Sequence, residues 1–193
     1  MFSRKAALRP VPDYATVSEH AVETLELELE AHGEDLQDAL DIGYRQLDRD
    51  QPSLAGWLSE QVTLCPDEMV QSLGYFLVIT VFMLFREAFP RRLTEVDEDA
   101  VQMAQSTLEV DEELRAHDPH EVLESDDVIG LTQPLVLDFI QHHIQEALEQ
   151  TEGELDIEAL DRLYRALLVE VIALSHAVAS PAGVVGPAPD ALA

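Results

Sequence analysis

Residues 73–85 read Leu-Gly-Tyr-Phe-Leu-Val-Ile-Thr-Val-Phe-Met-Leu-Phe and carry no charged side chain. Pro66 and Asp67 favour a first helical turn just before this run, and Phe89-Pro90 ends it, so the pattern predicts one long helix over residues 66–89. The β-branched residues within the run suit a strand, but a strand is usually only about five or six residues long. The uncharged run is also shorter than the about twenty residues of a membrane span. A helix that is apolar on every side must be buried, so we expect the rest of the chain to wrap around it.

The remaining sequence predicts an all-α protein. Periodic apolar segments bounded by caps, glycines and prolines indicate a bundle of about seven helices in a single domain, residues 14–178. Residues 1–13 hold two prolines and no helical period, so we expect a flexible arm there, and the proline-rich residues 179–193 predict a disordered tail.

Two helix starts are predicted from capping patterns. Thr16 and Thr94 are each followed three residues later by an acidic residue, which is typical of a capping box, so we expect these threonines to cap helices. Residues 25–30 alternate leucine with glutamate, which is the period of a strand. Both residue types are strong helix formers, however, and we expect a helix there that stops at Gly33.

Two segments of the chain resemble each other. Gln51-Pro52 and Gln133-Pro134 each open a short helix with an aromatic residue five positions after the proline, and each short helix leads into a long apolar one. The pattern predicts that residues 51–89 and 133–178 are two copies of one helix pair, with coincidence in a helix-rich sequence as the alternative.

Acidic residues outnumber basic ones by 39 to 11, which gives a net charge of −28. Such a chain repels nucleic acid and anionic membrane surfaces and attracts divalent cations or basic proteins. Residues 95–127 are the most acidic part, with thirteen acidic residues and a single arginine, Arg115. A docking site for a basic partner and a merely solvated face are the two interpretations of this part, and for the whole chain the negative charge is also explained by solubility.

The sequence contains no motif of a known catalytic type. Phosphate loops, dinucleotide fingerprints and nucleophile elbows are absent, and the single cysteine, Cys65, excludes zinc fingers and an intramolecular disulfide. No secretory signal pattern opens the chain, so we expect a cytoplasmic protein without a membrane segment or a cofactor.

A few carboxylate and histidine side chains are candidates for a metal or ligand site. Glu170 interrupts an apolar stretch, where a carboxylate is costly unless it is paired, protonated or bound to a ligand. The alternatives to a site are an ion pair with Arg45, Arg86 or Arg165, or a gap in the packing that leads to water. The other candidates lie at helical spacing or near the end of the same apolar stretch: His142, His143, Glu146 and His176.

The sequence therefore predicts a non-enzymatic acidic protein that acts in protein interaction or regulation, with a basic protein as the expected type of partner. One alternative is a helical-bundle binder of a metal or small ligand that uses Glu170 and nearby histidines. Another is an acidic mimic of nucleic acid that binds a basic protein. Self-association into a homo-oligomer is compatible with each of these functions.

Added salt is predicted to stabilise the fold. Folding gathers the carboxylates onto a compact surface, and salt shortens the screening length from about 30 Å at 0.01 M to about 3 Å at 1 M. We expect the Tm at pH 7 to rise with sodium chloride, and neutralising several acids of residues 95–127 to glutamine or asparagine to have the same effect. A Tm that stays constant or falls with salt, measured by circular dichroism, would show that the acids are already compensated.

Overall fold

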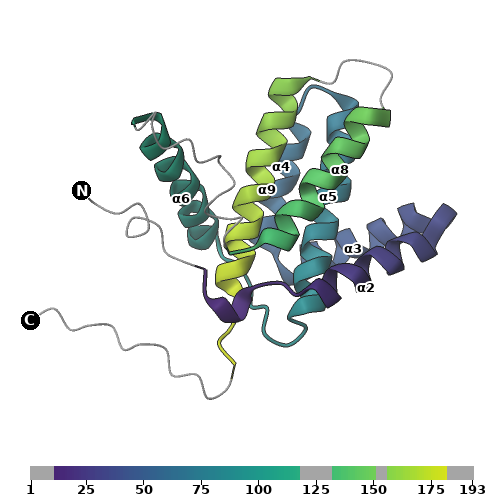
Figure 1. Ribbon diagram of the computed structural model, residues 1–193, viewed down its shortest axis with the longest axis horizontal. Helices are drawn as coiled ribbons and strands as arrows, with labels where there is room; N and C mark the ends of the chain where they lie inside the picture. Colours follow the sequence, from purple (N-terminus) through teal and green to yellow (C-terminus); the bar gives the residue numbers. More distant parts are fainter. Residues whose placement is uncertain (1–10, 118–131, 151–155, 182–193) are drawn as a thin grey trace, which may run out of the picture.

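The computed structural model of the protein describes residues 11–117, 132–150 and 156–181. These residues form the seven helices that the sequence predicts, and the only β-type pairing among them is a single bridge between Leu93 and Val178 (Figure 1). The helices are α2 (Glu19–His32), α3 (Leu36–Asp50), α4 (Pro52–Thr63), α5 (Glu68–Ala88), α6 (Glu98–His117), α8 (Pro134–Gln150) and α9 (Ile157–Ala177). The prediction of an all-α bundle is confirmed. The predicted arm and tail lie mostly outside the described residues.

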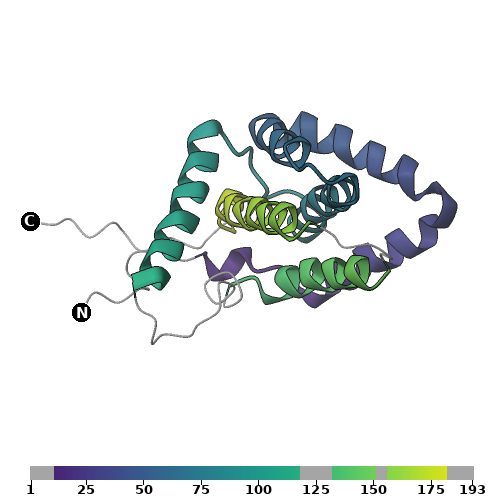
Figure 2. The same ribbon diagram turned by 90° about the horizontal axis from the view of Figure 1, so that it is seen from above.

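The core is built on two long apolar helices, α5 and α9. Helix α5 is the segment predicted to be central, and most of its residues between Val70 and Phe85 are buried. Helix α9 is buried to the same degree over Leu163 to Ser175, and the two helices pack against each other (Figure 2). The central position is therefore shared by two helices rather than held by one.

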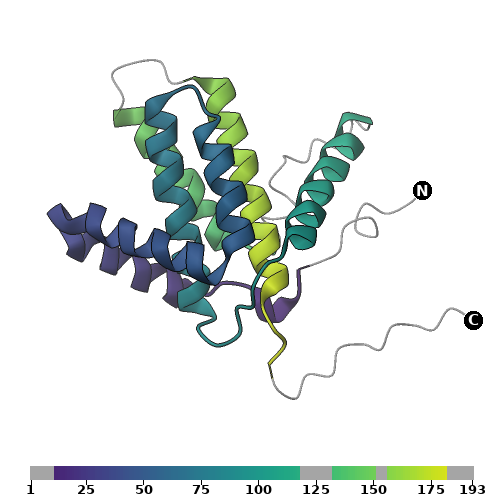
Figure 3. The ribbon, with the colours of Figure 1, turned by 180° about the vertical axis from the view of Figure 1, so that it is seen from behind.

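The other helices cover this pair. Helices α2, α3, α4 and α8 contact α5, while α6 packs on the opposite side of α9 (Figure 3). The distal ends of α2 and α3 project away from the bundle on either side of Gly33, whose positive φ of 49° suits the turn between them. Residues 26–28 and 30–33 in this projection are exposed.

Helix α5 has the length and composition of a membrane span, and among the described helices it alone does. Its apolar residues are instead used inside the bundle, where Leu77, Ile79 and Phe82 are completely buried. Cys65 lies just before this helix and is also buried, with its sulfur 3.8 Å from the carbonyl oxygen of Ala159. Burial raises the pKa of the Cys65 thiol, in keeping with a small packed residue.

The predicted capping threonines are wrong in both places. Helix α2 is capped by Ser18, whose hydroxyl oxygen accepts a bond from the Ala21 amide, and α6 is preceded by Asp97, whose carboxylate accepts one from the Ala100 amide at 2.8 Å. Thr94 has a different role, because its hydroxyl donates to the carbonyl oxygen of Ala177 at 2.6 Å. It thereby satisfies one of the orphan carbonyls at the end of α9.

Two buried glutamines hold the segments that precede α2 and α6. The side-chain amide of Gln51 donates to the Thr94 carbonyl oxygen at 2.9 Å and accepts from the Val96 amide at 2.7 Å. The side-chain amide of Gln133 makes the same pair of bonds, donating to the Ala15 carbonyl oxygen at 2.6 Å and accepting from the Val17 amide at 2.9 Å. In a β-sheet, the backbone groups of an extended segment bond to a neighbouring strand. Here the side-chain amide of each glutamine supplies those hydrogen bonds instead.

The two helix pairs predicted to be copies form as expected, α4 with α5 and α8 with α9. Both long helices start with a capping aspartate, Asp67 and Asp156, each of which accepts bonds from two amides of the first turn. The Asp156 amide also donates to the Asp67 carboxylate at 3.2 Å, which brings the two starts together. The duplication itself stays a prediction.

Replacing either glutamine tests how much these hydrogen bonds contribute to the stability of the fold. Replacing either Gln51 or Gln133 by alanine leaves two backbone groups without partners, and each such group costs about 1–3 kcal/mol when it is buried. We expect each variant to lose at least about 2 kcal/mol of unfolding free energy in urea titrations. The control is Gln102→Ala on the exposed face of α6, which we expect to be neutral. Losses as small as that of the control would show that water replaces the glutamine amides.

Candidate functional site

Glu170 lies in the middle of α9 and is completely buried. Neither of its carboxylate oxygens has a hydrogen-bond partner, so the expected ion pair with Arg45, Arg86 or Arg165 is not formed. Burial alone raises the pKa of Glu170 well above its ordinary value, which favours the protonated, neutral form of the side chain. The predicted burial of this carboxyl group is therefore confirmed, and an apolar core accommodates its neutral form more readily than its charged form.

The histidine candidates on α8 form a small group with one glutamate. His143 Nδ1 is 3.3 Å from a Glu146 carboxylate oxygen, and His142 Nε2 is 3.8 Å from the other. The His143 ring also meets the rings of Phe76 and Phe139 edge-on, with centroids 5.0 and 4.5 Å away. Burial lowers the pKa of His143, against the opposing effect of Glu146, so this ring acts mainly as an aromatic packing group.

The described residues contain no group of three or more histidine, cysteine, aspartate or glutamate side chains that could hold a metal ion. Glu170 and the α8 histidines lie on different helices, and Glu170 bonds to neither histidine. His176 lies in the last turn of α9, six residues beyond Glu170. The structure thus pairs His142 and His143 with Glu146 but does not join them to Glu170.

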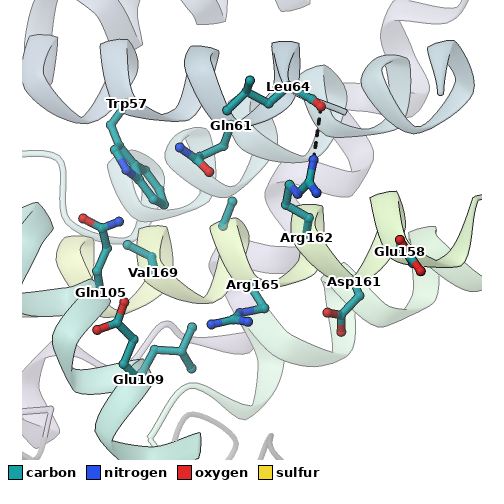
Figure 4. Close-up of a pocket in the computed structure, with 12 residues that line it drawn as sticks. Trp57, Gln61, Leu64, Gln105, Glu109, Glu158, Asp161, Arg162, Arg165 and Val169 are labelled. Carbon is teal, nitrogen blue, oxygen red and sulfur yellow. Dashed lines mark hydrogen bonds between the residues drawn. The ribbon is translucent and has the colours of Figure 1, made fainter. Parts of the chain in front are cut away.

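A groove that the sequence did not predict runs between α4, α6 and α9. It has a volume of about 440 Å³, within the usual range of ligand pockets, about 300–1,000 Å³. Figure 4 shows Trp57 and Gln61 on α4 at the top, Gln105 and Glu109 on α6 at the lower left, and α9 across the middle. Charged side chains of α9 complete its wall: Glu158, Asp161, Arg162 and Arg165.

The two arginines in the groove are already bound within the protein. The Arg165 guanidinium donates to the Glu112 carboxylate at 2.8 Å, and Arg162 donates to the Leu64 carbonyl oxygen at 3.2 Å (Figure 4). Within the described part of the chain, no ion pair or side-chain hydrogen bond engages the carboxylates of Glu109, Glu158 or Asp161. The groove therefore presents three free carboxylates and two arginines with their partners in place.

Three large exposed apolar side chains lie at the end of the bundle where Leu64 and Glu158 line this groove. Leu64 ends α4, Met69 lies in the first turn of α5, and Ile157 begins α9; they are 57%, 55% and 67% exposed. The bonds from Arg162 to Leu64 and from Asp156 to Asp67 hold these three helix ends together. We call Leu64, Met69 and Ile157 the apical patch.

Sequence reasoning missed the groove and the apical patch because both combine residues from distant segments. Trp57, which lines the groove, is only partly buried. The one available signal was the placement of Arg162 and Arg165 three residues apart in a chain with few basic residues. That spacing puts both on one side of a helix, but it does not say what lies opposite.

Glu170 predicts a measurable dependence of stability on pH. Between its ordinary pKa and its raised folded-state pKa, the folded protein binds a proton that the unfolded chain has lost, so stability falls as pH rises, by up to about 1.4 kcal/mol per pH unit. We expect Glu170→Met to gain stability over the wild type as pH rises above the ordinary pKa of 4.5 towards the raised folded-state pKa. Urea titrations at each pH measure this difference.

The control for this experiment is Glu23→Met on the exposed face of α2. Its stability relative to the wild type is expected to stay nearly constant over the same range. If the stability difference between Glu170→Met and the wild type is also constant over this pH range, Glu170 is ionised in the folded protein and is paired with a positive charge.

Comparison with protein families, with curated proteins and with solved structures finds no match to this chain.

Proposed function

We propose that the chain is a non-enzymatic binding protein that docks a basic amphipathic segment of another protein on its apical patch. The single observation that carries this proposal is the exposure of Leu64, Met69 and Ile157 together at one end of the bundle. Exposed apolar side chains that gather at one place are typical of interaction sites.

The surroundings of the apical patch support a basic partner. Acidic side chains on each of its three helices are exposed, namely Glu60, Glu68 and Glu158. An apolar centre with a charged rim is the usual arrangement of a protein interface. The net charge of −28 opposes a second copy of the same chain and draws positively charged partners by long-range attraction.

An amphipathic helix is the partner shape that suits this surface. Three apolar side chains on three adjacent helix ends form a compact target, which the apolar stripe of one helix covers with residues spaced three or four apart. Lysine or arginine on the flanks of that stripe then meets the acidic rim. Solubility alone explains the negative charge but leaves the exposed apolar patch without a role.

The test uses three synthetic helical peptides with a fluorescent label. One has a leucine stripe and lysine elsewhere, the second has the same stripe with glutamate in place of lysine, and the third keeps the lysines but replaces leucine with glutamine. We expect the leucine–lysine peptide to bind at least tenfold more tightly than either of the others in fluorescence anisotropy at 0.15 M salt. Charge alone gives equal binding of both lysine peptides, and that result would contradict the proposal.

Single substitutions locate the site. Ile157→Ser in the apical patch is expected to weaken binding of the leucine–lysine peptide by about tenfold, or about 1.4 kcal/mol. The matched control is Leu27→Ser, because Leu27 on α2 is as exposed as Ile157, at 66% against 67%. Equal losses in the two variants would place the peptide elsewhere on the surface.

A further inference from the structure

We infer that the groove between α4, α6 and α9 receives an arginine side chain of the docked segment, next to the indole ring of Trp57. This inference rests on the proposed function and extends it, because the groove shares Leu64 and Glu158 with the apical patch and its rim. A segment that binds the apical patch therefore lies next to the part of the groove that Leu64 and Glu158 line. The occupant is a guanidinium group for three reasons: the charge of the groove, the shape of the groove, and a difference between the two predicted copies at this position.

Charge favours a cation in the groove. The carboxylates of Glu109, Glu158 and Asp161 have no internal partner in the described chain, whereas Arg162 and Arg165 are bound to acceptors. An incoming anion would have to compete with Glu112 for Arg165 and would face the three free carboxylates. An incoming cation gains unpaired acceptors without breaking a bond.

Shape favours arginine over other cations. Trp57 is partly buried, and Figure 4 shows its indole beside Gln61 and across from Gln105. A planar guanidinium stacks on an aromatic face while its N–H groups still reach carboxylates in its plane, and tryptophan is the strongest partner for such a cation. The aliphatic part of the arginine side chain then lies along Val169 and Leu108, which also line the groove.

The third reason is a difference between the residues at matching positions of the two predicted copies. Counted from the Gln-Pro pairs, Trp57 corresponds to Phe139 and Gln61 to His143. Counted from the capping aspartates, Arg165 corresponds to Phe76. Phe76 on α5 and Phe139 on α8 both pack on His143, with ring centroids 5.0 and 4.5 Å from the His143 ring.

Under the predicted repeat, the location between α5 and α8 that is filled with aromatic rings corresponds to the groove beside α4 and α9. Packing in protein interiors is normally dense, and the three rings between α5 and α8 achieve this density. In the groove, Gln61 and Arg165 occupy the positions that correspond to His143 and Phe76. Under the predicted repeat, the groove is a local difference between the two copies, which is expected where one copy has acquired a site.

The experiment uses Trp57 as its own reporter, since it is the only tryptophan in the chain. Two versions of the leucine–lysine peptide carry one central arginine or the neutral isostere citrulline. We expect the arginine peptide to change the tryptophan emission saturably and to bind about tenfold more tightly than the citrulline peptide. A double variant, Glu109→Gln with Asp161→Asn, is expected to abolish that difference, because it removes two groove carboxylates from exposed positions.

The matched control is Glu23→Gln, which removes an exposed carboxylate of α2 outside the groove and the patch and is expected to keep the tenfold preference for arginine. Equal affinities of the arginine and citrulline peptides for the wild type would overturn the inference while leaving the proposed docking intact. If none of the peptides binds, Nα-acetyl-argininamide titrated alone against the tryptophan emission decides the matter. A saturable change that the double variant loses supports the groove as an arginine site, and a constant emission refutes it.

Discussion

The structure depends on the packing of two apolar helices, α5 and α9, against each other. The buried stretches of the two helices, residues 77–85 and 166–175, carry few polar side chains, so each needs the other and a cover of further helices. Their approach is close at Gly74, where an added Cβ atom would lie 2.9 Å from Leu163 Cδ1. Helix α3 approaches α5 in the same way at Gly43, where a Cβ atom would lie 2.6 Å from Ile79 Cγ2. These glycines set how tightly the layers close.

The helices could be predicted from the sequence because their signals are local. The uncharged run of residues 73–85 and the prolines at 52, 66, 90 and 134 define the start, end or burial of a segment within a few positions of it. The predicted cap at Thr94 failed for a reason that is not local. Thr94 donates its hydroxyl to the end of α9, and Asp97 caps α6 in its place.

The candidate site was predictable only in part for the same reason. The burial of Glu170 followed from its apolar neighbours, whereas its lack of a partner depended on whether any arginine of another helix could reach it. The groove joins side chains that are up to 112 positions apart, from Trp57 to Val169, and its charge depends on Arg165 being bound to Glu112. Composition suggests only the charge of the proposed partner, whereas the groove in which we propose that it binds depends on the packing of α4, α6 and α9.

The bonds of Gln133 carry a consequence for how the chain folds as it leaves the ribosome. This side chain holds Val17 and Ala15, which are 116 and 118 residues earlier, and it also donates to the Ser175 hydroxyl at 2.9 Å. The segment that leads into α2 is therefore synthesised first but cannot take its final place until most of the chain has emerged. Loop closure over such a distance is slow compared with helix formation. The bonds that hold the segment before α2 therefore form only after Gln133 has been synthesised, whereas α2 itself can pack on α5 earlier.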